Sequence, residues 1–200
     1  MPRLAEHTDA TVRAISRALW AGESPERLVP QLLGLAREVE PGSATWRFAL
    51  RNLALTWAPT SPWKASLVAR DLLAHEPADH AAWAALGLAQ SILDNCRFAI
   101  RCYERALRIA PGEPRYAHNL GHLYDVVLGK PHEAVPLLKV AYEAEPRCPD
   151  TAASYAHALA RTGEIDSAVT VLRAALRGGA TRHQRELMRW LRAQQGTAQG

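Results

Sequence analysis

Between residues 80 and 111, apolar side chains recur every three or four positions in two successive runs. The first run contains Trp83 and Leu86, and the second contains Ala99, Tyr103 and Ala106. This spacing places the apolar side chains of each run on one face of an amphipathic helix. The outer face of the second helix carries Arg97, Arg101, Arg105 and Arg108. A hairpin of two such helices cannot bury its outer apolar stripes alone, so it needs a neighbour.

Prolines divide the rest of the chain at a similar spacing. They end the related strings EVEP, AHEP, RIAP and EAEP at intervals of 36, 34 and 35 residues, at Pro41, Pro77, Pro111 and Pro146. Because proline bars its predecessor from the α region, each of these marks a helix end. The pattern predicts one solenoid domain over residues 1–195, with hairpins at about 7–41, 42–77, 78–111, 112–146 and 147–181, a final helix at 181–194 and a disordered tail at 196–200.

The order of large and small residues in the third hairpin resembles the tetratricopeptide repeat (TPR) family. Trp83, Leu86-Gly87, Ala99, Tyr103, Ala106 and Pro111 follow the family pattern W-x2-L-G…A-x3-aromatic…P. Gly87, Ala99 and Ala106 are small enough to let two helices approach closely. The resemblance implies an all-α fold, a right-handed TPR-type superhelical solenoid of about five helical hairpins plus a C-terminal capping helix.

The resemblance also implies a concave groove, lined by the first helix of each hairpin, that holds a peptide. Counting from the start of each repeat gives an apolar floor in the third unit and a polar wall with histidines in the fourth and fifth. The candidate partner-binding residues are Ala84, Leu88, Ser91, Ile92, Arg115, His118, Asn119, His122, Asp125, His157 and Arg161. The same repeat positions include Val126, Asp150, Ala153, Ser154 and Ala160.

Two other interpretations of these positions stay open. In the first, the alanines of the third unit are there only because alanine stabilises exposed helices, and they take no part in binding. His118 and His122 share a helix face, and with His157 they are the residues that a transition metal would use. We nevertheless expect no metal or other cofactor, because neighbouring helix axes are about 10 Å apart.

A carboxylate clamp of the kind found in some TPR proteins is not expected in this chain. Asn119 matches one of its five positions, but Ala84, Leu88, Asp150 and Ser154 occupy the other four. The chain also contains no G-x-S-x-G, P-loop or dinucleotide-binding glycine motif, so no enzymatic activity is expected. The sequence predicts a non-enzymatic adaptor or scaffold for a protein partner. The alternatives are a small TPR chaperone for secreted or assembling subunits, and a metal- or nucleic-acid-responsive regulator.

Composition and charge narrow the list of partners. A hydrophobic content of 48% with 22% charged residues is typical of a globular protein, and a net charge of +4 is mild. No aromatic stacking platform accompanies the arginine stripe of the third hairpin or that of the last helix, formed by Arg182, Arg185, Arg189 and Arg192. We therefore interpret both stripes as solvated faces and do not expect a nucleic acid partner. An exposed Trp20, Trp57 or Trp63 would mark a second interface, and an oligomer through the N-terminal or C-terminal end stays open.

Three features of the sequence bear on the cellular location of the protein. Cys96, Cys102 and Cys148 lie in no C-x-x-C pair, which is typical of reduced thiols. The N-terminus lacks the apolar core of a signal peptide, and no run of about eighteen apolar residues occurs, so no membrane insertion is expected. We therefore expect a cytoplasmic protein, and the alanine and arginine bias suggests a bacterial origin.

Overall fold

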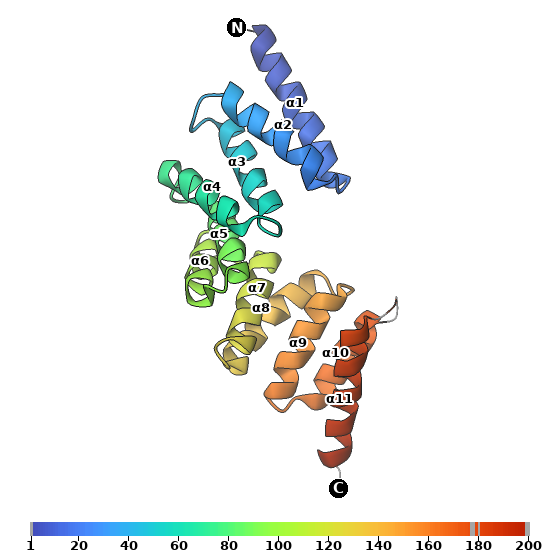
Figure 1. Ribbon diagram of the computed structural model, residues 1–200. Coiled ribbons are helices and arrows are strands. Elements are labelled where there is room, and N and C mark those ends of the chain that lie inside the picture. Colours follow the sequence, from blue (N-terminus) through green and yellow to red (C-terminus); the bar gives the residue numbers. More distant parts are fainter. Residues whose placement is uncertain (1, 177–178, 180, 199–200) are drawn as a thin grey trace. The chain divides into compact units, whose positions relative to one another are not determined.

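The computed structural model describes residues 2–176, 179 and 181–198, and within them it contains helices and no strand (Figure 1). Short turns join consecutive helices, which pack as hairpins. The predicted all-α repeat fold is therefore confirmed. None of the helices in this part of the chain is both long enough and apolar enough to cross a membrane.

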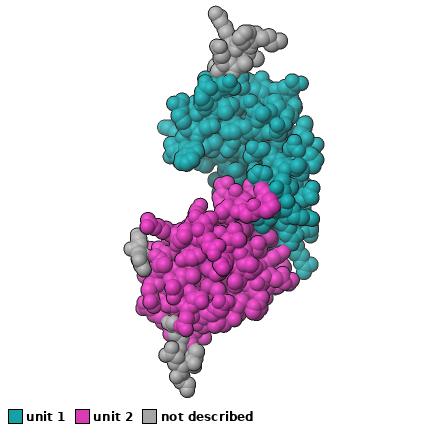
Figure 2. Space-filling view, turned by 180° about the vertical axis from the view of Figure 1, so that it is seen from behind, with its two compact units in different colours: residues 1–109 teal, residues 110–200 magenta. Residues whose placement is uncertain are grey.

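Two compact units make up the chain, residues 1–109 and residues 110–200 (Figure 2). The first contains α1 (Pro2–Trp20), α2 (Pro25–Glu38), α3 (Ala44–Trp57), α4 (Pro62–His75), α5 (His80–Ile92) and α6 (Cys96–Ile109). The second contains α7 (Pro114–Val126), α8 (Pro131–Ala144), α9 (Pro149–Arg161), α10 (Ile165–Ala175) and α11 (Arg182–Ala198). The single solenoid domain predicted over residues 1–195 stays a prediction.

Prolines and polar caps determine where the helices begin and end. Proline is the first residue of α2, α4, α7, α8 and α9, where its missing N–H costs no hydrogen bond, at Pro25, Pro62, Pro114, Pro131 and Pro149. Ser43 caps α3 by accepting from the N–H of Trp46 at 3.1 Å, and Asp79 caps α5 by accepting from Ala82 at 2.9 Å. The helices α2, α4, α6 and α8 all end shortly before the recurring prolines.

Two glycines allow the helices of a hairpin to cross closely, as the sequence pattern requires. A Cβ atom on Gly87 of α5 would lie 3.1 Å from ring carbons of Tyr103 of α6. A Cβ atom on Gly121 of α7 would lie only 2.7 Å from Cγ of Leu138 of α8. Tyr103 and Leu138 are both buried, so neither side chain has free space into which it can move.

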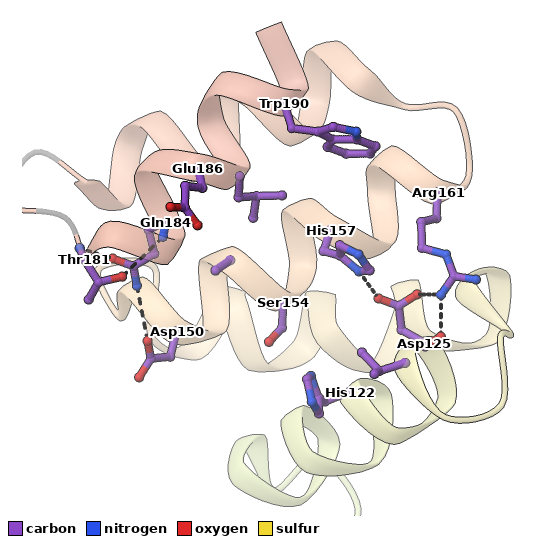
Figure 3. A pocket seen from close by; sticks show the side chains of 13 residues that line it. His122, Asp125, Asp150, Ser154, His157, Arg161, Thr181, Gln184, Glu186 and Trp190 are labelled. Carbon is purple, nitrogen blue, oxygen red and sulfur yellow. Dashed lines mark hydrogen bonds and ion pairs between the residues drawn. The ribbon is translucent and has the colours of Figure 1, made fainter. Parts of the chain in front are cut away.

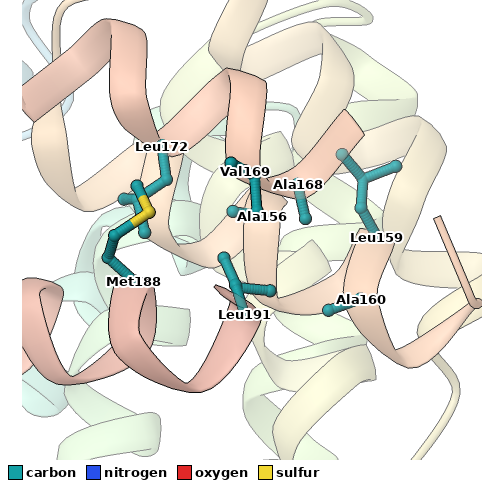
Figure 4. Packing of buried hydrophobic residues seen from close by; sticks show 8 residues of the cluster. All are labelled: Ala156, Leu159, Ala160, Ala168, Val169, Leu172, Met188 and Leu191. Atoms are coloured by element: carbon teal, nitrogen blue, oxygen red, sulfur yellow. The ribbon is translucent and has the colours of Figure 1, made fainter. Parts of the chain in front are cut away.

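The helix α11 covers the last hairpin, as predicted for a capping helix. Its side chains Met188 and Leu191 pack with Val169 and Leu172 of α10 and with Ala156 of α9 in one apolar cluster (Figure 4). The helix continues through residues 196–198, for which the sequence predicts a disordered tail. The segment contains no proline to end the helix, and residues 199–200 lie outside the described part of the chain.

The tryptophans of the first unit differ in their surroundings. Trp20 at the end of α1 is 94% exposed and Trp63 on α4 is 56% exposed. Trp57 instead packs against two buried clusters, one from α1, α2 and α3 and one that includes Ala65 of α4 and Ala89 of α5. Of the three candidates for a second interface, only Trp20 and Trp63 therefore present most of their surface to solvent.

Replacing Gly121 by alanine tests the close crossing of α7 and α8. The added methyl group overlaps a buried branch point, which costs about 1–3 kcal/mol, while alanine in a helix gains about 1 kcal/mol over glycine. We expect Gly121→Ala to lower the free energy of unfolding by up to about 2 kcal/mol in urea denaturation followed by circular dichroism. Gly34→Ala in α2 is the control, since nothing lies within 4 Å of its added Cβ, and it should raise stability. Equal stabilisation by both substitutions would contradict the close crossing.

Candidate functional site

A groove of about 970 Å³ lies within the second unit, between α7, α9 and α11 (Figure 3). The helix α9 provides its floor, and α7 and α11 provide its two sides. Its lining combines apolar side chains, histidines and charged groups. The lining residues are His122, Asp125 and Val126 of α7, then Asp150, Ala153, Ser154, His157 and Arg161 of α9, and Thr181, Gln184, Glu186, Leu187 and Trp190 at and within α11.

A buried carboxylate joins α7 to α9 at one end of the groove. Asp125 is only 2% exposed. Its Oδ2 accepts from Nδ1–H of His157 at 2.5 Å, and its Oδ1 accepts from Nη1 of Arg161 at 2.7 Å. The same guanidinium nitrogen donates to the backbone oxygen of Asp125 at 2.5 Å. A carboxylate that is withdrawn from water in this way needs such charged or polar partners, so the network fixes the position of α7 relative to α9.

A second network positions α11 at the other end of the groove. The backbone N–H of Gln184 donates to Oγ1 of Thr181 at 3.2 Å, and the N–H of Thr181 donates to Oε1 of Gln184 at 2.9 Å. This reciprocal pair is a capping box, which begins a helix by satisfying its free N–H groups. The remaining polar atom of the buried Gln184, Nε2, donates to Oδ1 of Asp150 on α9 at 3.2 Å. Asp150 is therefore held at a fixed place on the groove floor.

The groove also has apolar walls that are open to solvent. Trp190 of α11 is 42% exposed and Val126 of α7 is 54% exposed. Leu187 lies one turn before Trp190 and also lines the groove. Ala153 contributes a small side chain to the floor, which leaves room for a side chain from a ligand.

Two histidines on α7 approach α9 from the same helix face. Nε2 of His118 lies 3.1 Å from Oγ of Ser154. Desolvation lowers the pKa of His118, and the nearby His122 lowers it further. Desolvation also lowers the pKa of His122 below its ordinary value of 6.5. Both imidazoles are therefore neutral at pH 7.

The contact between His118 and Ser154 has no oxyanion hole from the backbone around Ser154. Ser154 lies within α9, where the surrounding backbone N–H groups are bonded inside the helix. They cannot form the oxyanion hole that acyl transfer requires.

The histidines do not form a metal site in the described part of the chain. There, no group of three or more His, Cys, Asp and Glu side chains is arranged to hold a metal ion. The ring centroids of His118 and His122 are 6.5 Å apart, and His157 uses Nδ1 to bond Asp125. These three histidines therefore act in contacts between helices and in the groove lining.

The predicted partner-binding residues fall into three groups. His122, Asp125, His157 and Arg161 line the groove, together with Val126, Asp150, Ala153 and Ser154 from the same repeat positions. Arg115, His118 and Asn119 lie on α7 but outside the groove lining. Ala84, Leu88, Ser91 and Ile92 belong to α5 in the first unit, where Ala84 is buried, Leu88 packs against a small alanine cluster and Ile92 is exposed.

The contribution of α11 to the groove is not predicted by the repeat pattern. From the sequence, Leu187, Met188, Trp190 and Leu191 form one apolar face that covers the last hairpin. In the structure Met188 and Leu191 are buried in that contact, while Leu187 and Trp190 lie along its edge and face the groove. The width of this apolar face is the sequence feature that could have indicated the role of α11 in the groove. A helix that only covers a hairpin does not require a tryptophan at the margin of its apolar face.

Comparison with known proteins agrees with this architecture. A family model described as tetratricopeptide repeat matches residues 128–191. No curated protein matches the chain.

Among solved structures, TTC0263, a thermophilic TPR protein of Thermus thermophilus, superposes with a TM-score of 0.68 at 20% identity, over 96% of this chain and 98% of that chain. MamA of Desulfovibrio magneticus RS-1 superposes with a TM-score of 0.64 at 18% identity, over 84% of this chain and 93% of that chain. YrrB, a TPR protein with an unusual peptide-binding site, superposes with a TM-score of 0.59 at 21% identity, over 65% of this chain and 67% of that chain.

Structural similarity at sequence identities this low establishes the fold. It does not identify the ligands or partners of this chain. The family match adds sequence evidence for the segment that contains α8, α9 and α10. The resemblance to the tetratricopeptide repeat family is therefore confirmed: residues 128–191 match the family, and the chain has the fold of tetratricopeptide repeat proteins.

Proposed function

We propose that this chain is a non-enzymatic adaptor or scaffold that binds a segment of a protein partner in the groove between α7, α9 and α11. TPR folds mediate protein–protein interaction through such grooves. The observation that carries the proposal is the groove itself, which presents open apolar walls beside polar groups already held in place. A site of this kind takes an apolar side chain and orients the backbone next to it.

The dimensions of the groove suit a short extended peptide. The lining residues of α9 run from Asp150 to Arg161, which are about 16 Å apart along the helix axis at 1.5 Å per residue. An extended chain covers this length with about five residues at 3.3 Å each. The groove is therefore matched to a segment within a partner protein more closely than to a folded surface.

Two further observations support this function. The related fold of YrrB carries a peptide-binding site, although one that is described as unusual for the family. The three cysteines of this chain, Cys96, Cys102 and Cys148, are free, which suits a reducing compartment such as the cytoplasm.

The proposal requires a groove whose sides are held in place before the partner binds, and Asp125 provides that connection. Asp125→Asn keeps the shape of the side chain but leaves Arg161 and His157 without a carboxylate. Because their side chains are 35% and 40% exposed, water compensates part of the loss, and we expect the free energy of unfolding to fall by about 1–2 kcal/mol. Glu143→Gln removes an exposed ion pair with Lys139 and should change stability by less than about 0.5 kcal/mol. Equal effects of the two substitutions would show that Asp125 does not support the groove.

Trp190 provides the direct test of peptide binding. Short random peptides displayed on phage would be selected on the immobilised full chain, and their affinities measured by fluorescence anisotropy after synthesis. We expect Trp190→Ala to weaken the selected peptides about tenfold or more, because it removes an exposed apolar wall that a ligand would cover. Circular dichroism should show an intact fold, since Trp190 lies outside the buried cluster beneath α11.

Trp63→Ala is the matched control, because Trp63 is a similarly exposed tryptophan on a helix of the first unit. It should leave the affinity unchanged. If selection enriches no peptide, the proposed function is wrong, and if Trp63→Ala weakens binding while Trp190→Ala does not, the binding site lies elsewhere.

A further inference from the structure

The charge of the groove is opposite in sign to that of the chain. The whole sequence has a formal net charge of +4. The groove lining contains three carboxylates, Asp125, Asp150 and Glu186, and one guanidinium, that of Arg161. Since the chain carries more arginine and lysine than acid overall, an acidic groove is a local feature and favours a ligand of positive charge.

The three carboxylates are not equally available to a ligand. Asp125 is buried and already bonded to Arg161 and His157. Glu186 forms an ion pair with Arg182 at 2.9 Å and a longer one with Arg189 at 4.0 Å.

Asp150 differs from both in its exposure and its partners. It is exposed, and among the described residues it forms no ion pair within 4.0 Å. Its Oδ1 accepts one hydrogen bond from Gln184, which leaves Oδ2 for a ligand. Asp150 is therefore the carboxylate best placed to meet a cation.

Asp150 and Trp190 lie toward different ends of the groove. Figure 3 shows Asp150 beside Gln184 near one end, and Trp190 above His157 toward the end that contains Arg161. From Asp150 to His157 the helix α9 advances about 10 Å. An extended chain that follows α9 covers this distance with about three residues. The distance between Asp150 and Trp190 therefore sets how far apart a ligand must carry the group that meets Asp150 and the side chain that meets Trp190.

We infer that the groove binds a segment with a bulky apolar side chain against Trp190 and a lysine or arginine about three residues away, facing Asp150. This inference rests on the proposed peptide-binding function and specifies its ligand. The apolar side chain would pack against Trp190, Leu187 and Val126, and the cation would lie beside Oδ2 of Asp150. An acidic segment is disfavoured, because its negative charge would lie near Asp150 and Glu186. Arg161, which also lines the groove, is already bonded to Asp125.

A set of synthetic peptides tests this assignment. Each is a peptide selected on the groove, with its bulky apolar residue kept and one residue about three positions away replaced by lysine, glutamine or glutamate. We expect the lysine peptide to bind the full chain about fivefold more tightly than the glutamine peptide, and the glutamate peptide to bind most weakly. The preference for lysine should shrink at high salt, since charges exposed in a groove are screened.

A pair of matched variants locates the charge that is responsible. Asp150→Asn should remove the difference between the lysine and glutamate peptides, while Oδ1 of asparagine still accepts from Gln184. Asp166→Asn makes the same change in the first turn of α10, outside the groove, and should preserve the difference. If the peptides depend on Trp190 but bind equally well with lysine and glutamate, the charge inference is wrong and the proposed function stands. If no peptide is selected on the groove, both are wrong.

The pH dependence provides a second arm of the same experiment. His122 is neutral above its lowered pKa, and Asp125 and His157 act on its charge. The ring of His118 lies 6.5 Å away on the same helix, and Asp150, Arg161 and Glu186 are the other charged groups that line the groove. Protonation of His122 below its lowered pKa adds positive charge to the groove, so the affinity for the lysine peptide should fall as the pH is lowered below 6.5. His122→Asn should reduce this fall, and His132→Asn, outside the groove on α8, should not. An affinity that rises on acidification would overturn the assignment of a cation.

Discussion

The arrangement of the second unit depends on one buried carboxylate. Asp125 receives hydrogen bonds from His157 and Arg161, and these bonds connect the last turns of α7 and α9. A charge so far from water is tolerated only because both of its oxygens are occupied. Hydrophobic contact has no preferred direction, whereas hydrogen bonds do. The Asp125 network therefore adds a directional connection between the two helices beside the groove floor.

The opposite side of the groove is positioned by a different type of contact. The helix α11 is attached to α9 and α10 by Met188 and Leu191, and its start is set by the capping box of Thr181 and Gln184 (Figure 4). Because Gln184 also bonds Asp150, the same side chain that begins the helix fixes the carboxylate in the groove. The capping helix therefore does two things: it covers the last hairpin, and its exposed edge forms a wall of the groove.

Much of the fold follows from the sequence because the repeat places strong local constraints. Proline and glycine act through backbone geometry, so the helix ends and the close crossings at Gly87 and Gly121 can be predicted from residue types. Counting positions within a repeat also identified His122, Asp125, His157 and Arg161, which the structure brings together in one groove. The burial of Asp125 could not be predicted, because a polar residue at a groove-facing position looks the same in the sequence whether it meets solvent or an arginine. The part of α11 in the groove lining depends on packing between helices that the repeat pattern does not encode.

We propose that a peptide lies between α7, α9 and α11 of the second unit. Photo-crosslinking measures this most directly: a selected peptide that carries a benzophenone beside its apolar residue is irradiated with the full chain, and the attachment sites are mapped by mass spectrometry. We expect the peptide to become attached within residues 122–126, 150–161 and 184–190, the segments that contain most of the groove lining. Attachment mainly within residues 1–109 would contradict it.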